Sequence, residues 1–309
     1  MTASSMEVFL ITASYLTIGV ILRRIPQVNS ETGNVLNSFV IHVSLPAVVL
    51  LKIPELSFSS DLLTPALLPW VMLGVSSAAV LCLSKLFAWQ RQVTGSLLLL
   101  VPLGNTSFLG IPMVKAFFGD GGVPYAVLYD QLGSFLALAT YGSIIIAAYG
   151  EASAPTLKQA AKKIITFPPF IALLGAFAFR PLQYPAIAVS MLQALGATLV
   201  PVVMIAVGFQ LTLCLSKESR APLIAGLVLK LAVAPAFALV LCRALGLEGE
   251  AVRVSIFEAG MPPMVSAGAL AMLAGLSPSL TASLVGLGIL LSFATLPLLH
   301  FILGYFIAY

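Results

Sequence analysis

The sequence predicts an all-α integral membrane protein with ten transmembrane helices, arranged as two inverted repeats of five helices each. Three observations lead to this prediction. The composition is 60% hydrophobic and only 8% charged, with a mean hydropathy of +1.08, whereas soluble domains are typically about 25% charged. Apolar runs long enough to cross a hydrocarbon core of roughly 30 Å recur along the whole chain. Short motifs also return at an offset of half the chain length.

The apolar runs are the ten expected helices. Their approximate bounds are 6–22, 35–53, 64–88, 95–118, 123–149, 166–180, 185–213, 222–244, 252–275 and 281–307. In the first run, the basic pair Arg23 and Arg24 follows the apolar residues instead of preceding them. Because a signal peptide carries its positive charge before the apolar segment, we expect this run to be retained as the first span.

The distribution of basic residues predicts the orientation. The odd-numbered loops carry nine basic residues and the even-numbered loops carry five. The nine are Arg23, Arg24, Lys85, Arg91, Lys158, Lys162, Lys163, Lys217 and Arg220, and the five are Lys52, Lys115, Arg180, Arg243 and Arg253. Since basic loops are typical of the cytoplasmic side, we expect both termini outside a cytoplasmic (inner) membrane. The net charge of +4 therefore reports orientation and does not indicate a nucleic-acid partner.

Three matches in register indicate an internal repeat. Pro46 in "VSLPAVVL" and Pro201 in "TLVPVVMI" are 155 residues apart, and Gly104 and Gly260 are 156 apart. "SFLALAT" also returns as "SFATLPL" after 158 residues. We expect a first repeat over 1–150, a cytoplasmic linker over 151–163 and a second repeat over 164–309. Because five spans per repeat is an odd number, the second repeat is inverted, which is typical of secondary transporters.

Two of the spans contain helix-breaking residues at corresponding positions. We expect the fourth span to be interrupted at Gly104 to Pro112 and the ninth at Gly260 to Pro263. Paired interruptions of this kind indicate a transporter binding site, although a proline kink that only shapes packing is the alternative. The expected substrate-binding residues are Gly104, Asn105, Thr106, Ser107, Pro112, Gln131, Gly260, Met261, Pro262 and Pro263.

The stretches "PLGNTSFLGIPMVKAFFGD" and "AGMPPMVSAGALAMLAG" resemble the two crossover segments of the auxin efflux carrier family, which includes the plant PIN carriers and many bacterial relatives. The resemblance covers nearly the whole chain. It implies a scaffold domain of helices 1, 2, 6 and 7, a transport domain of helices 3–5 and 8–10, and an elevator-like movement. It also implies a small organic anion as substrate and favours a homodimer. The long cytoplasmic loop of the plant carriers is absent here, so their phosphorylation-based control is not carried over.

Ionisable residues inside expected spans are candidates for ion coupling, because a charge in the membrane is costly and usually functional. Asp130 lies about two turns into the fifth span and is either a proton-coupling acid or a buried acid that is hydrogen-bonded for structure. Glu258, just before the ninth-span interruption, is either a second coupling candidate or the partner of Arg253. Lys230 is either a snorkelling side chain or the partner of a buried acid.

Asn105 is the sharpest candidate for substrate binding, because its amide can donate to a carboxylate and also satisfy a freed carbonyl. It can equally cap the following half-helix. His42 can face a cavity, but a lone histidine is more often a packing residue. Pro46 and Pro201 are further candidates from the repeat.

A secondary active carrier for a small carboxylate explains these features together, driven by protons or by the membrane potential. No G-x-x-x-x-G-K-[ST] nucleotide motif occurs, and two histidines 258 residues apart do not indicate an enzyme. Cys82, Cys214 and Cys242 are isolated, so we expect no metal and no cofactor. The alternatives are a sodium-coupled organic anion symporter of the bile-acid type and a passive channel. Proton or potential coupling is favoured because the ninth-span interruption offers only Ser266 as a nearby side-chain oxygen.

Overall fold

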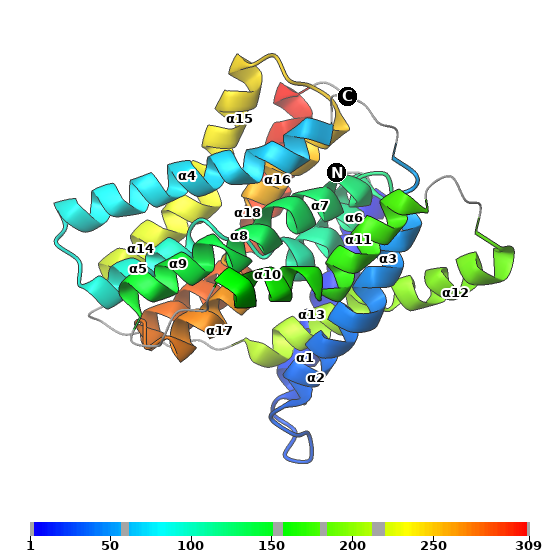
Figure 1. The fold of residues 1–309 in the computed structure, drawn as a ribbon, viewed down its shortest axis with the longest axis horizontal. Helices are drawn as coiled ribbons and strands as arrows, with labels where there is room; N and C mark the ends of the chain where they lie inside the picture. Colours follow the sequence, from blue (N-terminus) through cyan, green and yellow to red (C-terminus); the bar gives the residue numbers. More distant parts are fainter. Residues whose placement is uncertain (1–2, 57–61, 151–156, 180–183, 212–219, 308–309) are drawn as a thin grey trace. The chain divides into compact units, whose positions relative to one another are not determined.

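The structure is a computed structural model that describes residues 3–56, 62–150, 157–179, 184–211 and 220–307 (Figure 1). These residues form helices and connecting turns, with one isolated β-bridge and no β-strand among them. Six helical segments are long and apolar enough to cross a membrane: Thr32–Lys52, Leu63–Leu86, Val123–Tyr149, Ala186–Gln210, Arg220–Ala244 and Pro278–Phe306. The structure thus agrees with an all-α integral membrane protein, and the inverted repeat of ten spans stays a prediction.

The chain divides into two compact units. The first contains residues 1–59, 107–127 and 163–211, and the second contains residues 60–106, 128–162 and 212–309. Residues 151–156, 180–183 and 212–219, which include Arg180, Cys214 and Lys217, lie outside the described part of the chain.

The helices of the first unit are α1 (Ala3–Leu22), α2 (Thr32–Phe39), α3 (Leu45–Lys52), α6 (Ile111–Phe118), α7 (Val123–Leu128), α11 (Pro168–Ala178), α12 (Ala186–Ala197) and α13 (Leu199–Gln210). The helices of the second are α4 (Leu63–Leu86), α5 (Arg91–Leu100), α8 (Leu136–Ala139), α9 (Tyr141–Tyr149), α14 (Arg220–Val228), α15 (Ala234–Ala244), α16 (Glu250–Ala259), α17 (Val265–Leu273) and α18 (Pro278–Phe306). Two helices contain a boundary between the units: α7 near its end, and α10 (Leu157–Ile165).

In the first unit, α1 packs along α13 through two glycines. A Cβ added to Gly19 would lie 2.1 Å from the carbonyl oxygen of Ile205, and one added to Gly208 would lie 2.0 Å from that of Leu16. Such short distances leave no room for a side chain, so the two backbones are in direct contact. Small residues at helix interfaces are typical of membrane proteins, where van der Waals packing holds helices together.

The repeated prolines of the first unit lie in two segments that contact each other. Pro46 is in the first turn of α3, and Pro201 is in the first turn of α13. The hydroxyl groups of Ser44 and Thr198, which precede these two prolines, are 2.7 Å apart. The hydrogen bond joins the two proline-containing segments and gives the buried Ser44 hydroxyl a partner.

Three turns of π-helix are each followed by a proline two residues later. Val40–Ser44 precedes Pro46, Thr106–Gly110 precedes Pro112, and Leu229–Val233 precedes Pro235. Proline has no N–H group, and its ring clashes with the carbonyl group four residues earlier. Widening of the preceding turn relieves that clash, and turns of this kind are frequent at functional sites.

A fourth π-helical turn, Tyr129–Phe135, has no proline after it. It contains Gly133, where an added Cβ would lie 2.2 Å from Cγ of Pro69 in α4. The Trp70 indole N–H also donates to the carbonyl oxygen of Leu132 at 3.0 Å. Close packing against α4 therefore fixes the position of this turn, which carries Asp130.

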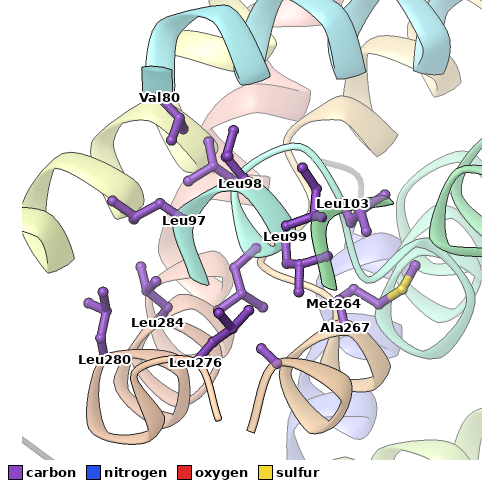
Figure 2. Packing of buried hydrophobic residues seen from close by; sticks show 14 of the residues in the cluster. Val80, Leu97, Leu98, Leu99, Leu103, Met264, Ala267, Leu276, Leu280 and Leu284 are labelled. Atoms are coloured by element: carbon purple, nitrogen blue, oxygen red, sulfur yellow. The ribbon is translucent and has the colours of Figure 1, made fainter. Parts of the chain in front are cut away.

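The hydrophobic core of the second unit surrounds α5 (Figure 2). Four consecutive leucines, Leu97 to Leu100, are at most 2% exposed. They pack with residues from several other helices of the unit, among them Val80, Ala267, Leu280 and Leu284. A run that is apolar on every side of the helix is what a helix surrounded by others requires, and this packing holds the end of α5 in place.

Candidate functional site

The two interrupted segments of the second unit meet and hydrogen-bond to each other. We call residues 101–105, which follow α5, together with residues 260–264, which follow α16, the crossing. The Asn105 backbone N–H donates to the carbonyl oxygen of Pro262 at 2.8 Å, and the Met264 N–H donates to that of Leu103 at 3.0 Å. Gly104 and Pro263 form the isolated antiparallel bridge. The freed backbone groups thus find partners in each other, which is how non-helical backbone is tolerated at membrane depth.

The interruption of the fourth span differs from the expected one. We expected it at Gly104 to Pro112, but α5 ends at Leu100 and helical structure resumes at Thr106. The expected interruption included Gly104 and Asn105 correctly but extended too far, because Pro112 is accommodated inside the continuous helical segment Thr106–Phe118, where a π-helical turn precedes it. The ninth-span interruption lies between Ala259 and Val265, as expected.

Gly104 lies against the side chain of a buried lysine. A Cβ at this position would be 3.1 Å from Nζ of Lys230 and 3.5 Å from Cβ of Met261. The Lys230 Nζ donates to the carbonyl oxygen of Ala259, the last residue of α16, at 3.4 Å. Lys230 is only 3% exposed, so it does not snorkel to an interface, and it is held at the crossing.

Asp130 is buried beside the crossing and its carboxylate accepts hydrogen bonds. The Thr106 hydroxyl donates to Oδ1 at 2.6 Å, and the Gln131 Nε2 donates to Oδ2 at 2.6 Å. All three residues are 2% exposed or less. Charge-assisted hydrogen bonds of this length are strong, so Thr106 ties the start of its π-helical turn to the turn that carries Asp130.

Glu258 has a different environment. It is fully buried in the last turn of α16, and neither carboxylate oxygen has a hydrogen-bond partner among the described residues. It makes no ion pair with Arg253 there, but it lies close enough to Lys230 and Asp130 to interact electrostatically. A buried carboxylate without direct partners is costly, and it therefore marks a place where a proton, water or ion completes the site.

A small cavity joins these groups within the second unit. Its volume is about 10 Å³, close to the space that one water molecule needs. Its polar lining comprises Ser76, Thr106, Tyr129, Ser134, Lys230 and Glu258. Tyr129 and Ser134 are absent from the residues expected from the sequence. Both residues lie in the same π-helical turn as Asp130. Their closeness to this intramembrane acid in the sequence could have indicated them.

The other expected site residues divide between the units. Asn105, Gln131 and Gly260 to Pro263 are buried in the second unit with the crossing. The remaining ones, Ser107, Pro112, His42, Pro46 and Pro201, belong to the first unit. His42 is exposed, and its Nδ1 lies 2.8 Å from the carbonyl oxygen of Ser38 in its own helical segment.

The first unit has a larger cavity of about 330 Å³. Its charged lining consists of two ion pairs, Lys52 with Glu55 at 3.1 Å and Lys115 with Asp120 at 3.2 Å. His42 does not line this cavity. No group of three or more His, Cys, Asp or Glu residues that could hold a metal ion occurs in the described part of the chain.

Two interrupted helical segments that meet inside a membrane protein are typical of transporters. The chain is a member of the membrane transport protein family, whose model matches residues 7–300, and this confirms the resemblance to the auxin efflux carriers. It is 28% identical to an uncharacterized transporter of Methanocaldococcus jannaschii, over 83% of this chain and 85% of that protein. It is also 29% identical to an uncharacterized transporter of Methanothermobacter thermautotrophicus, over 91% of this chain and 92% of that protein.

Proposed function

We propose that the protein is a secondary active carrier that moves a small organic anion, a carboxylate, across the cytoplasmic membrane by elevator-like alternating access. Asn105 carries this proposal. It is 2% exposed at the crossing, and its Nδ2 has no hydrogen-bond partner among the described residues. An unmade hydrogen bond of a buried donor costs about 1–3 kcal/mol, and a carboxylate oxygen is a suitable acceptor for this N–H group.

The segment after the crossing supports an anionic substrate. The helix α17 begins at Val265, directly after the crossing. The first N–H groups of a helix have no partner within it and carry a partial positive charge, which favours an anion. The Asn105 amide and this helix terminus are therefore the two donors that we assign to the substrate carboxylate.

The division of the chain supports the elevator-like mechanism. Residues 60–106, 128–162 and 212–309, which contain the crossing, form one compact unit, and residues 1–59 and 163–211 fall in the other. We propose that the unit with the crossing transports the substrate and that the first unit is the scaffold. The segment 107–127, which we expected in the transport domain, groups with the first unit.

For energy coupling we assign Glu258 ahead of Asp130. Asp130 accepts hydrogen bonds from Thr106 and Gln131, which support its charged form without a proton. Glu258 has no such donors among the described residues, so binding and release of a proton there changes fewer contacts. Glu258→Gln is expected to abolish accumulation driven by a pH gradient and to retain substrate exchange. Accumulation by this variant with wild-type pH dependence would contradict the assignment, and loss by Asp130→Asn alone would return the role to Asp130.

The direct test is a search for the substrate, followed by a transport assay. The purified protein is heated with sodium and potassium salts of mono- and dicarboxylates, with chloride as the control. A ligand at 100 times its Kd stabilises a protein by about 2.7 kcal/mol, so a specific carboxylate raises the unfolding temperature. Saturable counterflow of that carboxylate in proteoliposomes is expected. Single-channel currents, or no counterflow with any stabilising anion, would reject a carrier of this class.

We also propose that both termini lie outside. Single cysteines are placed at Gly150 and Asp120 in a variant without the native cysteines. A membrane-impermeant maleimide is expected to label position 120 from the outside and position 150 from the cytoplasm only. The reverse pattern would invert the orientation and leave the carrier proposal unchanged.

A further inference from the structure

The ammonium group of Lys230 occupies a position that suits a monovalent cation. It donates to the carbonyl oxygen of Ala259 at 3.4 Å, at the C-terminal end of α16. The last carbonyl groups of a helix have no partner within it and carry a partial negative charge. In transporters with interrupted helices, such carbonyl groups are the ligands of coupling cations.

The surroundings of this ammonium group are rich in oxygen atoms. The same small cavity is lined by Glu258, Thr106, Tyr129 and Ser134. The Glu258 carboxylate is fully buried without a hydrogen-bond partner among the described residues. Carboxylate, carbonyl and hydroxyl oxygens are the ligands of hard cations. The Lys230 side chain thus fills a set of ligands that would otherwise be free to hold an ion.

We propose that Lys230 is a built-in substitute for a coupling cation, and that shortening its side chain opens a sodium site formed by Glu258, the Ala259 carbonyl group and neighbouring hydroxyl groups. The proposal rests on the carrier function proposed above, since a cation at the crossing of a carrier is its coupling ion. On this proposal the intact protein needs no sodium at the crossing, because its cation is covalently attached and moves with the transporting unit in both directions.

The backbone next to Lys230 agrees with this role. Gly104 leaves the space for the ammonium group, since a Cβ there would be 3.1 Å from Nζ. Lys230 itself lies in a π-helical turn, five residues before Pro235. The widened turn and the glycine together place the end of a long side chain at the crossing. Removal of the side chain beyond Cβ enlarges the small cavity that Glu258 and the neighbouring hydroxyl groups line.

The test measures sodium binding without substrate. Purified wild type, Lys230→Ala and the control Lys115→Ala are heated in NaCl and in choline chloride of equal ionic strength. Only Lys230→Ala is expected to unfold at a higher temperature in NaCl, by roughly 3 °C at ten times the Kd for sodium. The shift should saturate with sodium and disappear in the double variant Lys230→Ala/Glu258→Gln, which lacks the anionic ligand.

Two results would overturn the proposal. One is a folded Lys230→Ala that unfolds at the same temperature in both salts. The other is a sodium-dependent shift in the wild type, which would mean that a sodium site exists beside the intact lysine. If Lys230→Ala folds in neither salt, Lys230→Gln is compared in the same way, and its insensitivity to sodium would count against the proposal.

The outcome is independent of the substrate. A wild type that shows no carboxylate counterflow while Lys230→Ala responds to sodium would reject the proposed transport function and keep the cation inference. Carboxylate counterflow by the wild type, with no sodium response in either Lys230 variant, would support the proposed transport function and reject the cation inference.

Discussion

Two groups of charged residues, one in each unit, lie in opposite environments. In the first unit, Lys115 and Asp120 pair at 3.2 Å with side chains 48% and 60% exposed. In the second, Lys230, Asp130 and Glu258 are at most 3% exposed, and the Glu258 carboxylate has no direct partner among the described residues. Exposed pairs contribute about 0–1 kcal/mol, whereas removal of one partner of a buried pair costs about 3–5 kcal/mol.

The exposed charges of the first unit have little effect on stability, whereas the buried charges of the second unit lower it. An exposed lysine and its acid are screened by solvent and salt, so either can be lost with little effect. Burial of a lysine and two acids among helices destabilises the folded protein. Such groups in membrane proteins usually act on a substrate or an ion. This contrast supports the proposed binding site in the second unit.

The largest expected effect comes from breaking the buried charge balance. Lys230→Met should lower the free energy of unfolding by about 3–5 kcal/mol, because Asp130 and Glu258 then lose their nearby positive charge. The double variant Lys230→Met/Glu258→Gln should recover much of this loss. Equilibrium unfolding in mixed micelles measures both. A double-mutant cycle on Lys115 and Asp120 serves as the control, with an expected coupling energy of about 0.2–1 kcal/mol. Equal coupling energies in the two cycles would remove the contrast between the units.

A methyl group at the crossing should have the next largest effect. Gly104→Ala places a Cβ 3.1 Å from the Lys230 Nζ and 3.5 Å from the Met261 Cβ, and overpacking of this kind costs about 1–3 kcal/mol. Gly74→Ala in α4 is the matched control, because a Cβ there has no neighbour within 4 Å. We expect reduced counterflow and a lower unfolding temperature for Gly104→Ala only. Equal behaviour of the two variants would show that the ammonium group moves away freely.

Asn105→Ala should weaken substrate binding and leave the fold intact. Loss of one hydrogen bond to a charged group corresponds to about 1–3 kcal/mol of binding free energy. The Asn105 backbone N–H that bonds to Pro262 is retained in the variant. Titration of the stabilising carboxylate by thermal shift measures the affinity, with the exposed Asn34→Ala as control. An unchanged Kd would mean that the Asn105 side chain only caps the following turn.

The sequence predicts the positions of the helices well, because length and apolar composition are local properties. The expected spans 35–53, 64–88 and 222–244 agree with Thr32–Lys52, Leu63–Leu86 and Arg220–Ala244. The expected fourth-span interruption extended too far, because a proline does not end a helix when the turn before it widens. Pro112 instead lies within the helical segment Thr106–Phe118, where the preceding π-helical turn accommodates it. Proline spacing alone does not identify the π-helical turns, because Tyr129–Phe135 has no proline after it, and Pro69 and Pro297 lie inside regular α-helices.

The partners within the site could not be predicted. Asp130, Glu258 and Lys230 are recognisable as intramembrane charges from one sequence. Their different environments depend on contacts between segments that are far apart in the chain. Lys230 reaches a carbonyl group 29 residues away, and Thr106 binds an acid 24 residues away. Packing decides which acid gains hydrogen bonds. From the sequence pattern alone, Asp130 was the first coupling candidate.

The smallest expected effect concerns the charges around the larger cavity of the first unit. Each lysine there faces its own acid, Lys52 with Glu55 and Lys115 with Asp120, so the four charges cancel. A lining without net charge does not attract anions over a distance, and half-exposed pairs are screened at physiological salt. Lys115→Met should therefore change the free energy of unfolding by less than about 1 kcal/mol and leave the KM for carboxylate counterflow unchanged at low and high salt. A large rise in KM that disappears at high salt, with stability intact, would make this cavity an anion-attracting entrance and would place part of the function in the first unit.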